Sequence, residues 1–270
     1  MRPILKIVNL ADIVALMEFS EKKVEYLRRA VESSGVIRNP FALAPIEDRK
    51  YLLLEDTALM EAVRMEGFTH IPAQIVPFSE SLESTADMLI GGMQPVYLDD
   101  FRKLFPRDCA IGSGEADSGS EKFSTVISFS MKENQNLLIC FRKNGAGVIS
   151  PAVFSFFDYL KRHCTLIEKV YPGEVRAINL KQATGNCIME AANITERDIH
   201  FAADRGLLFP SGLLKLEYGC RIMRIDYPVG ILKADATLRE KEQFLHDLVN
   251  YRLSSGCSRF LRSGIYLLNY

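Results

Sequence analysis

The chain has 270 residues, of which 48% are hydrophobic and 25% are charged. With 33 basic and 34 acidic residues the formal net charge is −1, so the composition lacks the basic surplus typical of nucleic-acid-binding proteins. No apolar run approaches the ~18 residues that a membrane span needs. The N-terminus is interrupted by Lys6, Asn9 and Asp12, which predicts a strand rather than a secretion signal. We therefore expect a cytoplasmic protein without a membrane partner.

The cysteines and histidines lack the spacing of a metal site. Six cysteines are scattered along the chain without a CxxC pair, and the four histidines share no ligand spacing. Scattered thiols are typical of proteins in a reducing cytoplasm. The sequence therefore predicts free cysteines and no metal-binding residues.

The N-terminal third reads as alternating strands and helices. Residues 4–8 predict a strand, and Ser20 caps a helix over residues 21–34 that ends at Gly35. A short extended piece follows at 41–45. Residues 51–54 then predict a second apolar strand, followed by a helix.

The helix after this strand ends at Gly67, and Pro72 is expected to open the next strand. A strand that runs directly into a helix brings the free N–H groups of the first helical turn together, and such a place favours an anion. Here the turn itself carries Glu55 and Asp56, followed by Thr57. These carboxylates oppose the binding of a phosphate and decide most of the functional interpretation.

The remaining two thirds predict mixed α and β elements. Residues 112–120 form a Gly/Ser loop that lacks the lysine of a phosphate-binding loop, so we interpret it as a surface loop. Residues 213–218 and 222–226 are predicted to pair through a turn at Gly219. The last helix is predicted over 237–253, with Leu238 facing inward and Lys241 outward. The other expected elements are a helix at 99–105, a hairpin of 124–130 with 137–141, a helix at 150–163, a strand at 165–170, a capped helix from Thr195 to about Asp204, and a strand at 264–268.

Two groups of residues carry a resemblance to known families. The order of Glu18, residues 37–40, residues 51–56, Gly67 and residues 71–72 resembles the ParB/sulfiredoxin-like module. Residues 209–216, Arg221 and residues 227–232 are similar to the C-terminal half of the free-serine kinases. That family includes the bifunctional regulator and O-phosphoserine synthase of the staphyloferrin B siderophore cluster. The resemblance implies an α+β protein with a ParB/sulfiredoxin-like α/β module at 1–78, packed on a C-terminal α+β domain at 79–270.

The resemblance also implies a reaction. The free-serine kinases transfer a phosphoryl group from ATP or ADP to L-serine with Mg²⁺ and give O-phospho-L-serine. Their catalytic base is an N-terminal glutamate, and Glu18 stands at the matching place, with Glu21 as the nearby alternative.

The same family motifs are degenerate in this chain. The family turn reads Asp-Gly-x-His-Arg, whereas this chain has Glu55-Asp56-Thr57-Ala58-Leu59, so the glycine and both cationic residues are replaced. In the C-terminal motif a Thr-Arg pair holds the substrate of the kinases, and here Leu214 and Lys215 stand in its place, with Arg221 following.

Three functions therefore remain open. The turn favours a non-catalytic or altered-substrate regulator linked to amino-acid or siderophore biosynthesis, which binds a small-molecule ligand. The first alternative is an active kinase that uses ATP or ADP with Mg²⁺. The second alternative is a ParB-like DNA-binding protein, whereas a nuclease has no carboxylate constellation to support it.

Overall fold

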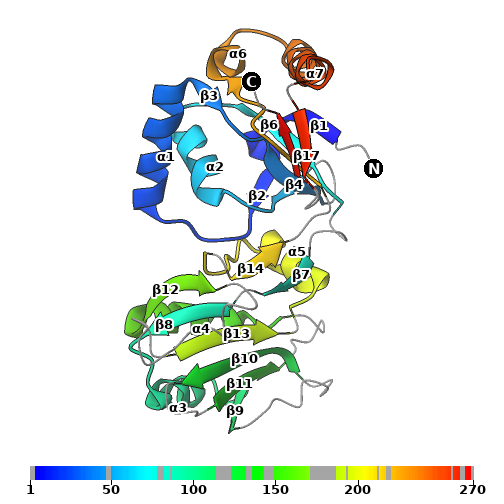
Figure 1. Cartoon of the computed structure of the whole chain (residues 1–270). Helices are drawn as coiled ribbons and strands as arrows, with labels where there is room; N and C mark the ends of the chain where they lie inside the picture. Colours follow the sequence, from blue (N-terminus) through cyan, green and yellow to red (C-terminus); the bar gives the residue numbers. More distant parts are fainter. Residues whose placement is uncertain are drawn as a thin grey trace. The chain divides into compact units, whose positions relative to one another are not determined.

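The computed structural model describes residues 4–46, 50–77, 82–85, 87–113, 123–131, 136–142, 149–170, 187–192, 194–211, 213–216, 220–256, 258–261 and 265–268. The chain forms two compact units, Met1–Leu82 with Leu216–Tyr270, and Glu83–Lys215. Both units contain helices and sheets, so the α+β class expected from the sequence is confirmed (Figure 1). Within the described residues, no helix combines the length and apolar character needed to cross a membrane.

The first unit is built on a mixed five-stranded sheet in the order β1-β6-β4-β5-β2. The strands are β1 (Ile4–Asn9), β2 (Ile13–Ala15), β4 (Phe41–Pro45), β5 (Tyr51–Leu53) and β6 (His70–Ile75), with a 3-10 turn at Leu10–Asp12. Two helices, α1 (Glu21–Ser34) and α2 (Thr57–Met65), lie together beside this sheet (Figure 1). Buried apolar side chains hold the helices against the sheet: Leu53 of β5 belongs to the same core as Met60 and Val63 of α2.

The C-terminal segment completes the first unit. Its elements are β15 (Arg221–Met223), β16 (Tyr227–Pro228), α6 (Val229–Lys233), α7 (Leu238–Ser254), β17 (Ser258–Leu261) and β18 (Ile265–Leu268). The short strand β16 pairs with β3 (Val36–Ile37), and α7 packs against β1. Ile225, Tyr227 and Leu245 are fully buried in the same core as the N-terminal strands. Burying such a side chain stabilises a fold by about 1.5–3 kcal/mol relative to exposure, so the segment is an integral part of this unit.

These compact units divide the chain differently from the boundary at residue 78 that the sequence suggested. Residues 216–270 lie with the N-terminal unit and not with the segment that precedes them. The physical reason is the shared core, because Tyr227 and Leu245 find their apolar partners among the N-terminal strands. The contiguous second domain expected from the sequence is thus interrupted by a return of the chain to its first unit.

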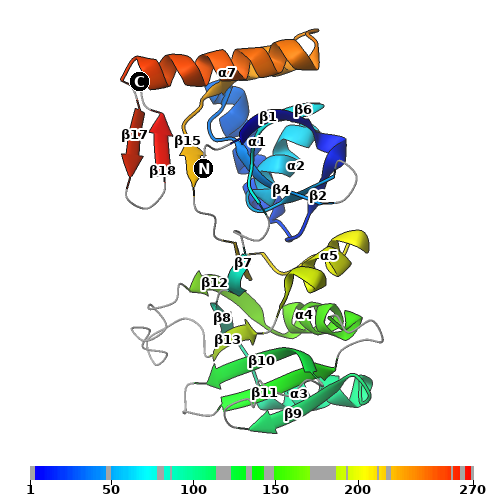
Figure 2. The same cartoon turned by 90° about the vertical axis from the view of Figure 1, so that its right-hand side faces the viewer.

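The second unit contains a six-stranded antiparallel sheet in the order β12-β8-β13-β10-β11-β9. Helices α3 and α4 pack on one face of this sheet (Figure 2). Phe101 of α3 and Phe156 of α4 contact each other and meet Phe141 of the sheet. The elements are β7 (Leu82–Thr85), β8 (Asp87–Gly91), α3 (Pro95–Leu104), β9 (Cys109–Ser113), β10 (Phe123–Met131), β11 (Asn136–Arg142), α4 (Pro151–His163), β12 (Thr165–Val170), β13 (Cys187–Ala192), α5 (Glu196–Asp204) and β14 (Leu214–Leu216).

Several predicted elements are confirmed. Helix α1 has the predicted bounds and ends at Gly35, whose φ of 66° is the left-handed conformation that favours glycine. Helix α5 begins with the predicted capping box at Thr195, and β10 and β11 form the predicted antiparallel pair. Most of the Gly/Ser loop at 112–120 lies outside the described residues, as does Gly219.

Two strand predictions are wrong in detail. Pro72 does not open its strand, because the pairing of β6 with β1 already begins at His70, opposite Asn9. Strands β14 and β15 do not pair with each other: β14 pairs with β7, and β15 pairs in parallel with β18. A pattern of alternating residues predicts a strand but not its partner, which depends on which edge is free in the folded unit.

The predicted faces of α7 also need correction. Lys241, expected outside, is only 6% exposed, and Leu238, expected inside, is 46% exposed. The Lys241 Nζ donates a 2.8 Å hydrogen bond to the carbonyl oxygen of Leu232 in the last turn of α6. A helix carbonyl without an intrahelical partner stabilises a buried ammonium there, and the aliphatic stem packs into the core. Leu238 is the first residue of α7.

Candidate functional site at the start of α2

The turn between β5 and α2 has an unusual backbone. Asp56 is the N-cap of α2 and has φ of 61° and ψ of 35°, in the left-handed region. Aspartate tolerates this region better than most side chains. Its carboxylate accepts no hydrogen bond from the first turn of α2, so the N-terminal N–H groups of the helix are not capped by it. Asp56 thus keeps a glycine-like conformation and adds a negative charge at the helix start.

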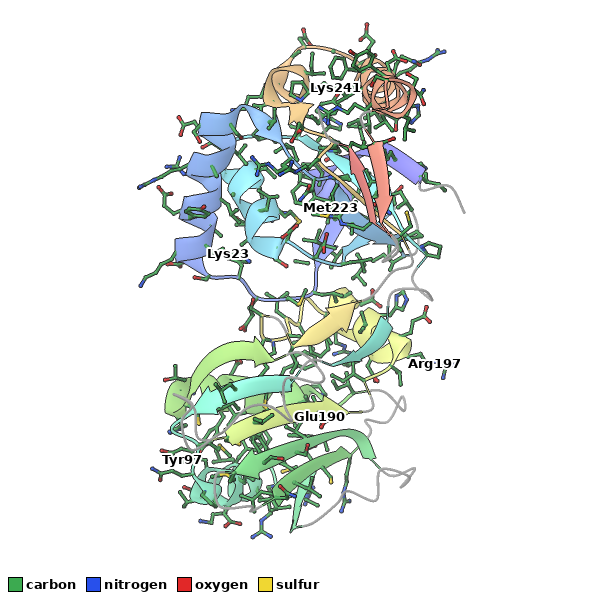
Figure 3. The ribbon with its side chains drawn as sticks, viewed as in Figure 1. Lys23, Tyr97, Glu190, Arg197, Met223 and Lys241 are labelled. Atoms are coloured by element: carbon green, nitrogen blue, oxygen red, sulfur yellow. The ribbon has the colours of Figure 1, made fainter. Side chains whose placement is uncertain are left out.

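The electrostatics of Asp56 reflect its position. Burial raises the pKa of the Asp56 carboxyl above its ordinary value, and the neighbouring charge of Glu55 raises it further. Arg221 and Lys23 act in the opposite direction and lower it. Lys23 is on α1 (Figure 3). Asp56 is exposed as a residue, while its carboxyl group is shielded enough for burial to be the largest cause of the raised pKa.

Glu55 has a different role, because Arg221 of β15 forms an ion pair with it. The Arg221 side chain is 11% exposed and that of Glu55 is 37% exposed. Arg221 also donates a 2.6 Å hydrogen bond from Nη1 to the carbonyl oxygen of Pro40. A buried guanidinium requires such partners, since an unpaired buried charge is strongly destabilising. The pair therefore neutralises Glu55 and links β15 to the turn.

Gln74 of β6 fixes the backbone on both sides of Arg221. Its Nε2 donates to the carbonyl oxygen of Cys220 at 2.7 Å, and its Oε1 accepts from the amide of Ile222 at 2.8 Å. The side chain is buried and replaces the backbone partners that a neighbouring strand would give. The sequence did not predict a role for Gln74, and its position among the apolar residues 71–75 of β6 was the signal that could have indicated one.

Thr57 is the first residue of α2 and is 5% exposed. Its Oγ1 is the one buried side-chain oxygen or nitrogen among the described residues that has no hydrogen-bond partner. A buried hydroxyl without a partner costs about 1–3 kcal/mol by mutational data. Thr57 therefore holds an unsatisfied polar group at the start of the helix.

The sheet places Glu18 at the same edge as this turn. Strands β2 and β5 are parallel neighbours, with Ala15 opposite Leu53. Glu18 follows the end of β2 and Glu55 follows the end of β5, so both leave the sheet at one edge. Glu18 belongs to the segment of the chain that connects β2 to α1, and it is half-buried.

The structure brings most, but not all, of the predicted site residues together. Glu55 and Arg221 are in direct contact, with Asp56 and Thr57 in the same turn and Glu18 at the same sheet edge. Lys215 lies in β14, and its side chain is outside the described residues. No group of three or more His, Cys, Asp or Glu side chains gathers in a metal-binding arrangement within the part of the chain that the structure describes.

Comparison with known proteins identifies the fold. No protein-family model and no curated protein matches the sequence. The structure, however, has the α+β fold of the free serine kinases, with which it shares 12–13% sequence identity. This similarity concerns the fold, because such identities are too low to transfer an activity.

Among the similar structures is "SbnI with C-terminal truncation from Staphylococcus aureus", with a TM-score of 0.70 and 16% identity, covering 90% of this chain and 96% of that chain. A free serine kinase in complex with AMP has a TM-score of 0.61 and 13% identity, covering 84% of this chain and 93% of that chain. A conserved hypothetical protein from Pyrococcus furiosus has a TM-score of 0.59 and 13% identity, covering 86% of this chain and 97% of that chain.

Proposed function

We propose that the chain is a small-molecule-binding protein with the free-serine-kinase fold, non-catalytic or acting on an altered substrate, and that it acts as a regulator linked to amino-acid or siderophore biosynthesis. The observation that carries this proposal is the carboxylate of Asp56 at the start of α2. A helix start that receives phosphate presents N–H groups and positive charge, whereas this one presents a carboxylate.

The ion pair of Glu55 and Arg221 strengthens this argument. Arg221 is the buried cation at the turn, and its guanidinium already serves Glu55 and the carbonyl of Pro40. A phosphate would have to compete with a carboxylate for the same donor group. The turn therefore favours a ligand that is neutral or carries a cationic group near Asp56, rather than a nucleotide polyphosphate.

The test is nucleotide binding to the whole chain, measured by thermal shift and by isothermal titration calorimetry with ATP, ADP and CTP, with and without Mg²⁺. We expect no shift in melting temperature for the wild type, because only a ligand that binds the native state raises it. Asp56→Asn removes the charge and Asp56→Gly also restores the backbone freedom, so affinity for ADP should increase about tenfold in both variants. Tight binding of ADP by the wild type would overturn the proposal.

An active serine kinase is the second candidate, and Thr57 favours it. Its buried Oγ1 lacks a partner and stands beside uncapped N–H groups of α2, a place where a phosphate oxygen could complete the hydrogen bonds. Solved free serine kinases of this fold contain AMP or ADP. Glu18, at the same sheet edge, is the candidate general base under this reading.

This candidate is tested by incubating the protein with L-serine, Mg²⁺ and ATP or ADP, and by detecting O-phospho-L-serine with ³¹P NMR. Activity that is abolished in Glu18→Gln and retained in Glu21→Gln would establish the kinase and the base. Absence of product, together with absence of nucleotide binding, would exclude it.

Magnesium fits this chain only in a limited way. Mg²⁺ in phosphoryl-transfer sites is bound by one or two carboxylates together with substrate phosphates and water. Asp56 supplies one carboxylate, while that of Glu55 is paired with Arg221. Under the kinase reading, Mg²⁺ would neutralise phosphate charge, and Asp56 is the residue that would hold it.

DNA binding is the third possibility, carried by the ParB-like resemblance alone. An electrophoretic mobility-shift assay with double-stranded DNA at several salt concentrations tests it, because phosphate contacts weaken steeply with salt. Salt-dependent retardation of the DNA would place this function ahead of the other two.

A further inference from the structure

Three residues other than glycine have a left-handed φ in the described part of the chain. They are Asp56 with 61°, Arg224 with 59° and Asp226 with 42°. Such conformations are unfavourable for residues with a Cβ atom and persist where surrounding contacts hold them. Arg224 and Asp226 belong to the loop between β15 and β16, which we call the 224–226 loop.

Arg252 of α7 holds this loop from one side. Its guanidinium donates a hydrogen bond to the carbonyl oxygen of Arg224 and lies 3.6 Å from the carboxylate of Asp226. The Arg252 side chain is 4% exposed and that of Asp226 is 15% exposed. A buried arginine so placed fixes the carbonyl and the carboxylate together, and thereby the two left-handed residues.

The loop Arg38–Pro40 holds the 224–226 loop from the other side. The amide of Arg224 donates to the Oδ1 of Asn39 at 2.9 Å, and the amide of Asp226 donates to the carbonyl of Arg38 at 3.0 Å. The adjoining strands β16 and β3 form an antiparallel pair. The segment 221–229 is thus fastened along residues 35–40 by a continuous series of hydrogen bonds.

The series ends at the turn before α2. Arg221 donates to the carbonyl of Pro40 and forms the ion pair with Glu55, next to the left-handed Asp56. The described left-handed residues other than glycine therefore all lie on one path of contacts. The path runs from α7 through the 224–226 loop and Arg221 to the turn, all within the first unit.

We propose that Arg252 is a positioning residue for the turn at Glu55–Thr57, acting through the 224–226 loop and Arg221. Arg252 keeps the loop in its left-handed conformation, the loop sets the direction of Arg221, and Arg221 fixes the turn through Glu55. The inference rests on the proposed function only in taking this turn as the ligand site. The contacts that connect Arg252 to the turn exist without a ligand.

The test is hydrogen–deuterium exchange of the whole chain, read by mass spectrometry on peptides that cover residues 36–44 and 52–60. In Arg252→Met we expect exchange about tenfold faster in both peptides, since loss of the guanidinium frees the loop and then Arg221. Peptides from β10 and β11 in the other unit should keep their wild-type rates. If Arg252→Met does not fold, Arg252→Lys, which keeps the charge but not the fork of donors, is measured instead.

A glycine substitution separates positioning from general stabilisation. Arg224→Gly removes the conformational strain at the position that Arg252 holds. In this background Arg252→Met should accelerate exchange at 52–60 by less than about threefold, because residue 224 is then a glycine and adopts the left-handed conformation without the help of Arg252. An equal acceleration in both backgrounds would contradict the positioning role.

Lys241→Met is the matched control, because Lys241 is a buried cation on the same helix with its contact at Leu232 of α6 (Figure 3). We expect it to lower the overall stability without selective exchange at 52–60. The proposal is overturned if Lys241→Met exposes this peptide as much as Arg252→Met does, or if Arg252→Met changes exchange in α7 alone. Failure of nucleotide or ligand binding leaves these exchange rates unaffected, so the two proposals are tested separately.

Discussion

Arg221 of β15 forms an ion pair with Glu55, a residue that lies far away in the sequence, in the turn between β5 and α2. The guanidinium is almost buried, and its second contact is the carbonyl oxygen of Pro40. The start of α2 is therefore defined by two parts of the chain, the N-terminal strands and the returning C-terminal segment. This relationship leads to the first prediction.

Glu55→Gln should destabilise the protein by about 1–3 kcal/mol, because it removes the negative charge of the ion pair that Glu55 forms with the buried Arg221. Urea unfolding followed by circular dichroism measures the change. The control is Glu25→Gln on α1, which removes an exposed partner of Arg28 and Arg29 and should have little effect. Equal effects of the two substitutions would show that the Arg221 pair has no special importance.

Gln74→Met should cost about 2–4 kcal/mol, since it keeps the volume but leaves the carbonyl of Cys220 and the amide of Ile222 without partners. Urea unfolding gives the loss of stability. Gln243→Met on α7 is the control, because Gln243 is exposed and its amide donates to the exposed Asp247. A loss below about 0.5 kcal/mol for Gln74→Met would mean that water replaces both hydrogen bonds.

Thr57→Val should stabilise the protein by up to about 1 kcal/mol, because it replaces a buried hydroxyl that has no partner by a methyl group of similar size. Thermal unfolding without ligand checks the sign of the change. The same variant should lose affinity for any ligand whose oxygen pairs with Oγ1. A clear destabilisation of the ligand-free protein would show that Oγ1 has a hydrogen-bond partner in solution.

The raised pKa of Asp56 predicts a pH dependence of stability. When the folded-state pKa lies above the unfolded-state value, the folded protein binds more protons between the two, and stability decreases as the pH rises through this window. Asp56→Asn cannot ionise and tolerates the left-handed backbone. We therefore expect Asp56→Asn to be more stable than the wild type at pH 7.

Lowering the pH provides the internal control for this prediction. Below the ordinary aspartate pKa of about 3.9 the carboxyl is protonated in both states, so the advantage of Asp56→Asn should vanish. Urea unfolding of both proteins at pH 7 and below pH 4 measures it. A stability difference that stays constant with pH would mean that the backbone, and not the charge, is responsible.

Local patterns in the sequence predicted the elements whose causes are local. Helix α1 has the expected bounds and ends at Gly35, because a helix stop depends on neighbouring residues, whereas the side chain of Ser20 does not form the expected cap hydrogen bond. The turn of Glu55, Asp56 and Thr57 was identified for the same reason. The pairing of β14 and β15 was predicted wrongly, since partner strands compete across the whole fold and their local pattern is the same.

Features that arise from distant contacts escaped prediction. Gln74 and Arg252 are polar residues whose importance follows from what they contact, Gln74 beside Arg221 and Arg252 at the 224–226 loop. Lys241 was expected in solvent, yet a carbonyl at the end of α6 receives its ammonium inside the unit. No spacing rule within a helix or strand contains this information.

The sequence by itself determined the mixed α and β character, the bounds of α1 and the acidic turn at the start of α2, because propensity, helix stops and charge act between residues that are close along the chain. Only the tertiary structure decided that residues 216–270 return to the first unit and that Arg221 neutralises Glu55. The first outcome depends on the burial of one common apolar core. The second depends on the buried guanidinium of Arg221, which needs a partner because burial removes it from water.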